Sequence, residues 1–419
     1  MRILLTGKNL VPEQGGGYTV SQDVLQALFR NAKNYTHEFF LLDSAFATSR
    51  TVELTRNFTR IEIHITRSFF RRLIERLNYE ARRRIKSKGN PSDPPLETPY
   101  QQAFRRELMK YHLDCALSLT PLVSSHILPT ISTVWDLEHR RKPYFPELAA
   151  NGIWERRERY YQPFLPKAIA VITGTQVGKS QLERFYGLDP QAIKVIPFPT
   201  PSFAHEHARR PECSNDELPA GISGEYLFYP AQFWPHKNHI RLLQVLKCLH
   251  ERHNWKGSLV FCGSDKGNLG YVKERAADLG VLSRTHFLGF VKQSELVALY
   301  RNALALTFVS YLGPDNLPPL EAFALGCPVI ASAIEGAEEG LDGAALFADP
   351  DSVSEIVAGV LRLKNESGLR KSLIAAGRFR ASQSTPEIYV GRLMELLDSL
   401  ELRFECFRTL SGPSATKPL

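Results

Sequence analysis

The sequence predicts an α/β protein of two Rossmann-like halves that face a central cleft. The chain has 419 residues, whereas a single hydrophobic core rarely organises more than roughly 250–300. Short apolar strands alternate with amphipathic helices along most of the chain, which is typical of parallel sheets covered by helices. Residues 199–224 are rich in Pro, Ser and Gly and lack apolar periodicity. This stretch predicts a linker between two runs of alternation.

The first run predicts an N-terminal Rossmann-like domain over residues 1–198. Apolar stretches predict strands over residues 2–6, 39–43, 61–66, 115–119, 131–135 and 168–173. Helical periodicity predicts helices over about 19–31, 100–111, 153–165 and 176–185. Three adjacent glycines follow the first strand, and the prolines of residues 89–95 predict a loop.

The second run predicts a C-terminal Rossmann-like domain over residues 225–385. Its expected strands cover residues 226–230, 259–263, 304–309 and 328–331. Its expected helices cover about 239–253, 270–279, 294–302, 319–325, 352–364 and 367–378. A helix over 386–405 is expected to cross back to the N-terminal domain, and residues 406–419 form a tail. Ligands of such sheets bind at the carboxyl ends of the strands, here between the two domains.

The composition is that of an ordinary globular protein, with 43% hydrophobic and 23% charged residues. No apolar run approaches the roughly 18–20 residues of a membrane-spanning helix. The apolar start of the chain is too short for a signal peptide. The six cysteines contain no C-x-x-C pair, so neither a disulfide framework nor a zinc site is predicted. We therefore expect a cytoplasmic protein.

The positive charge is concentrated in residues 67–88, which carry nine basic and two acidic residues. Their apolar positions have helical spacing, with arginines on the opposite face. Such a helix can attach peripherally to an anionic membrane surface, here the inner face of the membrane. The alternative is a helix packed on its own domain with a solvated basic face. No aromatic platform or nucleic-acid motif accompanies the charge, so nucleic-acid binding is not expected.

Two stretches of the second half predict an anion site. Lys237 follows a strand and opens a helix. Some eighty residues later, a loop ends in two prolines and begins a helix with Glu321 in its first turn. The free amides of Asn316 and Leu317 and the positive end of that helix favour a phosphate, with Lys237 opposite. Glu321 is placed to accept hydrogen bonds from a ribose diol. The alternative is a capped helix and an exposed lysine.

These stretches, residues 229–239 and 310–332, resemble the donor-binding half of family 4 of the retaining glycosyltransferases, which have the GT-B fold. The second stretch carries the sequence Gly-Pro-Asp-Asn-Leu-Pro-Pro-Leu-Glu, like one branch of that family. Further pieces of resemblance lie at residues 15–17, 133–147, 173–182, 194–197 and 287–300. The resemblance covers about residues 1–400.

The resemblance implies transfer of a sugar from a nucleoside-diphosphate sugar to an acceptor hydroxyl with retention of anomeric configuration. The acceptor would be a glycan or a lipid-linked glycan in surface polysaccharide synthesis. A lysine and a helix terminus can compensate the charge of the diphosphate without a metal, so we expect no metal and no further cofactor. Lys237 would bind the diphosphate and Glu321 the ribose. The other donor-binding residues implied or inferred are Gly16, Gly17, Gln232, Gly263, Asp315, Asn316 and Leu317.

The sequence departs from the family pattern at several positions. The first glutamate of the family's E-x7-E pattern is replaced by Gly313, and an arginine by Gln232. The family's histidine in the central N-terminal segment is replaced by Trp135. We therefore predict His139 and Asp136 as catalytic residues together with Lys237. The departures leave one alternative open, an inactive nucleotide-sugar-binding scaffold or partner protein.

Overall fold

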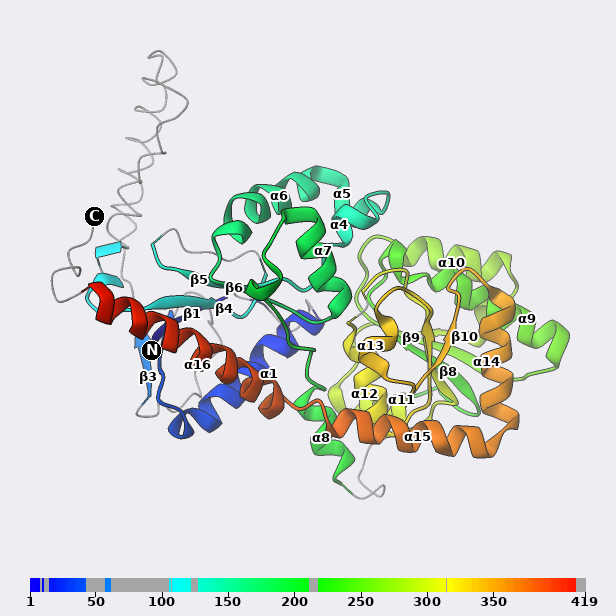
Figure 1. The fold of residues 1–419 in the computed structure, drawn as a ribbon. Coiled ribbons are helices and arrows are strands. Elements are labelled where there is room, and N and C mark those ends of the chain that lie inside the picture. The colour runs from blue at the N-terminus through cyan, green and yellow to red at the C-terminus, as the bar shows by residue number, and fades with distance from the viewer. Residues whose placement is uncertain are drawn as a thin grey trace, which may run out of the picture.

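The structure is a computed structural model, and it describes residues 1–7, 10, 15–42, 57–61, 105–106, 108–121, 127–210, 218–313 and 315–411. It contains two parallel sheets that lie side by side, each with helices packed on it (Figure 1). The predicted α/β class and the two Rossmann-like halves are confirmed. The basic segment 67–88, residues 62–66 of the predicted strand 61–66 and half of the predicted helix 100–111 lie outside the described residues.

The N-terminal sheet has seven strands in the order β3-β2-β1-β4-β5-β6-β7, all parallel. Alternate residues of a strand face opposite sides, so Ile3 and Leu5 join one core cluster while Leu4 joins another. The strands are β1 (Arg2–Thr6), β2 (Glu38–Leu42), β3 (Phe58–Ile61), β4 (Cys115–Ser118), β5 (Thr130–Thr133), β6 (Ala170–Thr173) and β7 (Ile193–Val195).

Helices cover both faces of this sheet (Figure 1). In the view shown, α1 (Gly16–Asn31) lies below the sheet, whereas α4 (Glu138–Arg141), α5 (Pro146–Ala149), α6 (Ile153–Phe164) and α7 (Gln176–Tyr186) lie above it. Helix α1 begins three residues earlier than predicted. Gly15 precedes it with φ 82°, a conformation that glycine adopts without a steric penalty, so the chain turns directly from the loop into the helix.

The C-terminal sheet has six parallel strands in the order β10-β9-β8-β11-β12-β13. They are β8 (Tyr226–Pro230), β9 (Ser258–Cys262), β10 (Thr285–Phe287), β11 (Ala305–Phe308), β12 (Val329–Ser332) and β13 (Leu346–Ala348). Its helices are α9 (His239–His253), α10 (Leu269–Asp278), α11 (Gln293–Asn302), α12 (Leu317–Leu325), α13 (Ala337–Leu341), α14 (Val353–Asn365) and α15 (Ser367–Ser382).

The predicted and observed elements differ mainly at the edges of the sheets. Strands β7, β10 and β13 were not among the predicted ones, and β3 lies before the predicted strand 61–66. All four are outermost strands of their sheets. An edge strand pairs on one side only and is short, so its apolar signal in the sequence is weak.

The stretch predicted as a linker contains a helix, α8 (Ser202–Ala208). Ala204 and His207 are buried, so α8 packs on neighbouring elements. The amide of Ser202 donates a hydrogen bond to Asp23 Oδ2 of α1 at 2.9 Å. A helix of seven residues after two prolines has too few turns to show a helical repeat of apolar residues. The sequence therefore predicted a linker without a helix.

The last helix, α16 (Pro386–Ser411), leaves the second half and lies along α1 of the first (Figure 1). Arg30 of α1 pairs with Glu387 at 3.3 Å, and the Met1 ammonium pairs with Glu401 at 2.5 Å. The chain therefore passes between the two halves twice, once at α8 and once where it enters α16.

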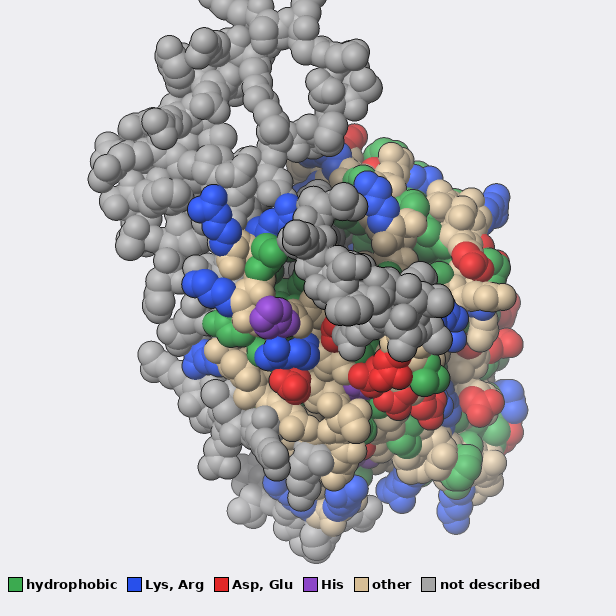
Figure 2. All heavy atoms as spheres, turned by 60° about the vertical axis from the view of Figure 1, so that its left-hand side comes forward, with side chains coloured by type: hydrophobic (Ala, Val, Ile, Leu, Met, Phe, Trp, Pro, Cys, Tyr) green, Lys and Arg blue, Asp and Glu red, His purple; other side chains and the backbone are tan. Residues whose placement is uncertain are grey.

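Among the described residues, no helix has the length and apolarity needed to span a bilayer. Basic and acidic side chains are interspersed over the described part of the face in Figure 2.

Candidate nucleotide-binding cleft

A cleft lies between the two sheets, at the ends of strands from both. It consists of two adjoining pockets of about 290 and 440 Å³ that share part of their lining. The N-terminal half contributes Gly15, Gly16 and Gly17, Trp135 and Phe198. The C-terminal half contributes a larger set: Pro230, Ala231, Gln232, Lys237, Gly263, Phe290, Phe308, Asp315, Asn316, Leu317, Pro318 and Glu321. The cleft therefore brings together most of the predicted site residues.

Lys237 provides the cation of the cleft. It is the last residue of a short turn over Pro235–Lys237. The next residue, Asn238, has φ 58° and donates hydrogen bonds from its side chain to the carbonyls of Val309 and Pro350. The Lys237 ammonium lies 3.5 Å from Asn316 Oδ1 and 5.1 Å from the centre of the Phe308 ring. Burial lowers the pKa of Lys237 to about 8. Among the described residues, the ammonium contacts an amide oxygen and a ring face but no carboxylate, an environment that favours an anionic ligand.

The start of α12 faces the same pocket. Pro318 and Pro319 have no N–H, so Asn316 and Leu317 carry the amides of the first turn that lack an intrahelical acceptor. The Asn316 side chain makes no capping bond and instead donates to the carbonyl of Gly313. The positive end of the helix and the Lys237 ammonium are therefore close to each other and border one cavity.

The structure gives a physical reason for the glycine at position 313. Gly313 has φ 86°, and a Cβ atom there would lie 2.9 Å from the amide group of Asn316. A glutamate would need both a strained backbone and a displaced Asn316. The usual carboxylate is therefore incompatible with this loop conformation, and the Asn316 amide occupies the space beside Gly313.

Asp315 lies where the donor loop meets the N-terminal half. Its Oδ2 accepts a hydrogen bond from the amide of Phe198 at 3.3 Å. A Cβ atom on Gly174 would lie only 1.9 Å from the same oxygen, so glycine is required at that position for this contact. Burial raises the pKa of Asp315 to about 7. Asp315 therefore connects the halves at the rim of the cleft.

Glu321 lies one turn into α12 and is nearly buried. Its Oε2 accepts a hydrogen bond of 2.6 Å from the hydroxyl of Tyr300. Burial raises its pKa to about 7, although the Tyr300 bond opposes the rise. Glu321 lines the larger pocket together with Gly263 and Phe290. A carboxylate in this place can accept hydrogen bonds from a ligand diol when it is ionised.

The predicted glycines allow backbone to approach backbone in the cleft. Gly263 has φ 145°, and a Cβ there would lie 2.4 Å from the carbonyl oxygen of Ala231. A Cβ on Gly17 would lie 2.6 Å from the Trp135 ring, and one on Gly16 would lie 3.1 Å from Leu317. Glycine at these positions therefore lets Ala231, Trp135 and Leu317 pack closely against the backbone that lines the cleft.

His139 and Asp136 lie differently from the prediction. His139 is completely buried and does not line the cleft. Its Nε2 lies 2.7 Å from Glu158 Oε1, and its Nδ1 lies 3.2 Å from Arg157. Asp136 pairs with Arg157 at 2.7 Å. Both side chains therefore contact residues of α6 and belong to a partly buried polar network with Arg157 and Glu158.

That network keeps His139 neutral. Burial and the Arg157 charge lower the pKa of His139, while Glu158 opposes this effect. Burial by itself would raise the pKa of Asp136, but the Arg157 ion pair outweighs it and the pKa is lowered. A neutral His139 with its proton on Nε2 can donate to Glu158 and accept from Arg157.

Sequence reasoning missed several residues that line the cleft. Trp135, noted only as a departure from the family, lines the smaller pocket and packs edge-on against Phe198 at 5.9 Å. Phe290 lines the larger pocket and is 70% exposed. Phe290 comes directly after Gly289, which has φ 68°, and no local pattern marks it as a residue of the cleft. Its position in the cleft therefore becomes visible only in the tertiary structure.

Polar contacts hold the two halves together on one side of the cleft. Glu147 of α5 accepts hydrogen bonds from the His236 amide at 2.9 Å and from its ring at 2.5 Å. The Lys142 ammonium donates to the carbonyl of Tyr311 at 2.7 Å. Across the cleft, Glu339 accepts from the amide of Gln176 at 2.6 Å. These contacts connect α5 with the turn that carries Lys237, the end of α4 with the loop before α12, and α7 with α13.

Residues 218–380 match the family model described as "Glycosyl transferases group 1". The chain is 26% identical over 231 residues to the O-antigen chain mannosyltransferase RfbU of Salmonella typhimurium, covering 54% of this chain and 59% of that protein. It is 27% identical over 223 residues to the D-inositol 3-phosphate glycosyltransferase of Corynebacterium glutamicum, covering 50% and 51%. The chain thus matches between half and three fifths of the length of these relatives.

The fold resembles that of solved glycosyltransferase structures. HepE of Anabaena in complex with UDP superposes with a TM-score of 0.63 at 16% identity, covering 95% of this chain and all of that one. A glycosyltransferase of Rickettsia africae superposes with a TM-score of 0.64 at 16% identity, covering 94% and 97%. The predicted GT-B fold is confirmed, and the family match supports a glycosyltransferase.

Proposed function

We propose that this chain is a glycosyltransferase that moves a sugar from a nucleoside-diphosphate sugar to an acceptor hydroxyl with retention of anomeric configuration. The observation that carries the proposal is the shared cavity of the Lys237 ammonium and the uncapped start of α12. The match of residues 218–380 to a glycosyltransferase family supports it. Residues 225–385 would bind the donor, and residues 1–198 the acceptor.

The chemistry of sugar transfer requires such a cavity. As the bond to the anomeric carbon breaks, the departing nucleoside diphosphate gains negative charge. A fixed ammonium and a helix N-terminus stabilise this charge without reorganising. Lys237, Asn316 and Leu317 would contact the diphosphate, and Glu321 the ribose. These groups supply positive charge from the chain itself, so we propose that transfer proceeds without a bound metal.

The first test is a calorimetric titration of the purified protein with UDP, GDP and ADP in metal-free buffer. We expect one diphosphate to bind, and Lys237→Ala or Glu321→Ala to weaken it about ten- to a hundredfold. Lys371→Ala, an exposed lysine of α15, is the matched control. Absence of binding by any of the three nucleotides would refute the assignment of the cleft.

An inactive nucleotide-sugar-binding protein is the second candidate. The incompatibility of the Gly313 position with a carboxylate favours it, because the usual sugar contact is missing. Release of nucleoside diphosphate from a bound nucleotide sugar separates the two candidates. Turnover with an acceptor, with the product configuration read by NMR, supports the enzyme. Binding of the donor without any release supports the scaffold.

We propose a glycan or lipid-linked acceptor in surface polysaccharide synthesis, at the inner face of the membrane. The name of the Salmonella relative, an O-antigen chain mannosyltransferase, supports the first part. The basic pattern of residues 67–88 supports the second. Sedimentation with anionic and neutral vesicles tests it. Equal binding to both would contradict an electrostatic attachment.

A further inference from the structure

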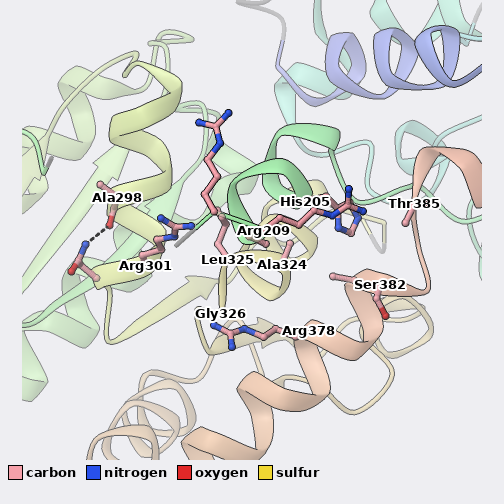
Figure 3. A pocket seen from close by; sticks show the side chains of 14 residues that line it. His205, Arg209, Ala298, Arg301, Ala324, Leu325, Gly326, Arg378, Ser382 and Thr385 are labelled. Carbon is pink, nitrogen blue, oxygen red and sulfur yellow. Dashed lines mark hydrogen bonds between the residues drawn. The ribbon is translucent and has the colours of Figure 1, made fainter. Parts of the chain in front are cut away.

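A second cavity, of about 790 Å³, borders the other end of α12. Leu317 and Glu321 at the start of that helix line the nucleotide cleft, whereas Leu325 and Gly326 at its end line this cavity. Its other walls come from α8, α11 and α15 (Figure 3). The cavity is therefore separate from the cleft but shares one short helix with it.

The lining of this cavity is strongly basic. It includes Arg209, Arg210, Arg301 and Arg378, and no Asp or Glu is among its lining residues in the described part of the chain. The side chains of Arg209, Arg210 and Arg378 have no hydrogen-bond or ion-pair partner among the described residues. Figure 3 shows Arg378 reaching along the floor beneath Gly326, with Arg301 on the opposite wall.

His205 adds an unsatisfied polar atom to the same wall. Its Nε2 is buried and has no hydrogen-bond partner among the described residues. A buried polar atom without a partner costs about 1–3 kcal/mol.

Helix ends account for only part of the positive charge. Helices α8, α11 and α12 all end at this cavity, and each C-terminus carries about half a negative elementary charge. Three helix ends therefore offset part of the charge of the guanidinium groups, and Arg301 also donates to the carbonyl of His207. The guanidinium groups of Arg209, Arg210 and Arg378 can pair with the oxygens of a phosphate or diphosphate group.

We propose that this arginine-lined cavity is a second binding site, which takes a phosphorylated small molecule. Guanidinium groups pair with phosphate oxygens in a bidentate manner, and their charge is permanent. The volume is typical of small-molecule sites and exceeds the space of one phosphate. Ala298, Ala324 and Ala381 line the rest of the cavity, so the uncharged part of the ligand would lie against small side chains.

The site lies beside both crossings between the halves. Helix α8 is bound to α1 through the Ser202 amide and Asp23. Ser382 and Thr385, which also line the cavity, belong to the segment that leads into α16. A bound anion would therefore connect α8 with α15, the two elements at which the chain passes between the halves.

The test is a calorimetric titration of the full chain with inorganic pyrophosphate at low ionic strength. The Lys237→Ala variant lacks the cation of the nucleotide cleft. Pyrophosphate that still binds tightly to this variant therefore occupies another site. We expect Lys237→Ala to retain one site. Adding Arg209→Gln and Arg378→Gln should weaken that site at least a hundredfold, about tenfold or more for each lost contact. Arg209→Gln alone should weaken it about tenfold.

Arg362→Gln is the matched control, because this arginine of α14 is exposed and lies outside the cavity. It should bind pyrophosphate like the parent. Thermal unfolding of each variant checks that the fold is retained, and Arg209→Gln alters an exposed side chain at a helix end. The proposal is overturned if Lys237→Ala abolishes all pyrophosphate binding. It is also overturned if the folded arginine variants bind as tightly as their Lys237→Ala parent.

Discussion

Replacing Lys237 with methionine should stabilise the empty protein while removing its affinity for a diphosphate. The lysine is half-buried in the cleft, beside Phe308 and Asn316. Burial lowers its pKa from 10.5 to about 8. The folded protein therefore holds this charge less favourably than the unfolded chain does. Methionine has a similar shape and no charge, so it removes that cost and retains the contact with the ring.

The magnitude follows from the change in pKa. Each pH unit by which a pKa moves corresponds to about 1.4 kcal/mol, so a fall from 10.5 to about 8 represents a cost of about 3 kcal/mol at pH 7. The cost is fully present below pH 8, where the lysine is charged in both states. It decreases as the pH rises towards 10.5, and at pH 10 it should be less than about 1 kcal/mol.

The assay is urea unfolding of parent and Lys237→Met protein at pH 7 and pH 10, with nucleotide titration on the same samples. Lys371→Met, on an exposed lysine, should change stability by no more than about 0.5 kcal/mol. We expect Lys237→Met to be the more stable protein at pH 7 and to bind diphosphate at least tenfold more weakly. A destabilised variant, or a stability difference that is equal at both pH values, would refute the reasoning.

Three further predictions concern the cleft and its support. Nucleotide affinity should be greatest near pH 7–8, because it falls below about pH 7 as Glu321 is protonated and above about pH 8 as Lys237 loses its charge; a flat profile between pH 5 and 10 would contradict this. Glu158→Gln should cost about 1.5–3 kcal/mol of unfolding free energy, since it removes the carboxylate that accepts hydrogen bonds from His139, Arg140 and Tyr186, yet leave nucleotide affinity within about twofold; a selective loss of affinity would instead place this network in the site. Gly263→Ala should weaken nucleotide binding, because the new methyl group would lie 2.4 Å from the Ala231 carbonyl and displace the lining backbone; unchanged affinity in calorimetry would show that this backbone is not part of the site.

The sequence alone predicted the features that depend on neighbours along the chain. Central strands such as β8 are continuous apolar runs because both faces are buried, so both Rossmann-like halves were recognisable. The double proline at positions 318 and 319 marks a helix start, and Lys237 follows a strand by a short turn. Their meeting in one cavity follows from the rule that strand ends converge in a parallel sheet.

The tertiary structure alone decided the features that depend on distant neighbours. His139 and Trp135 lie four residues apart, and no local pattern shows which one faces the cleft; α6 buries His139 through Glu158, while Trp135 packs against Phe198. The basic cavity likewise needs arginines from positions 209 to 378, which only the packing of α8, α11 and α15 around the end of α12 brings together. The physical reason is that side-chain direction and burial depend on contacts between elements, and these contacts have no period in the sequence.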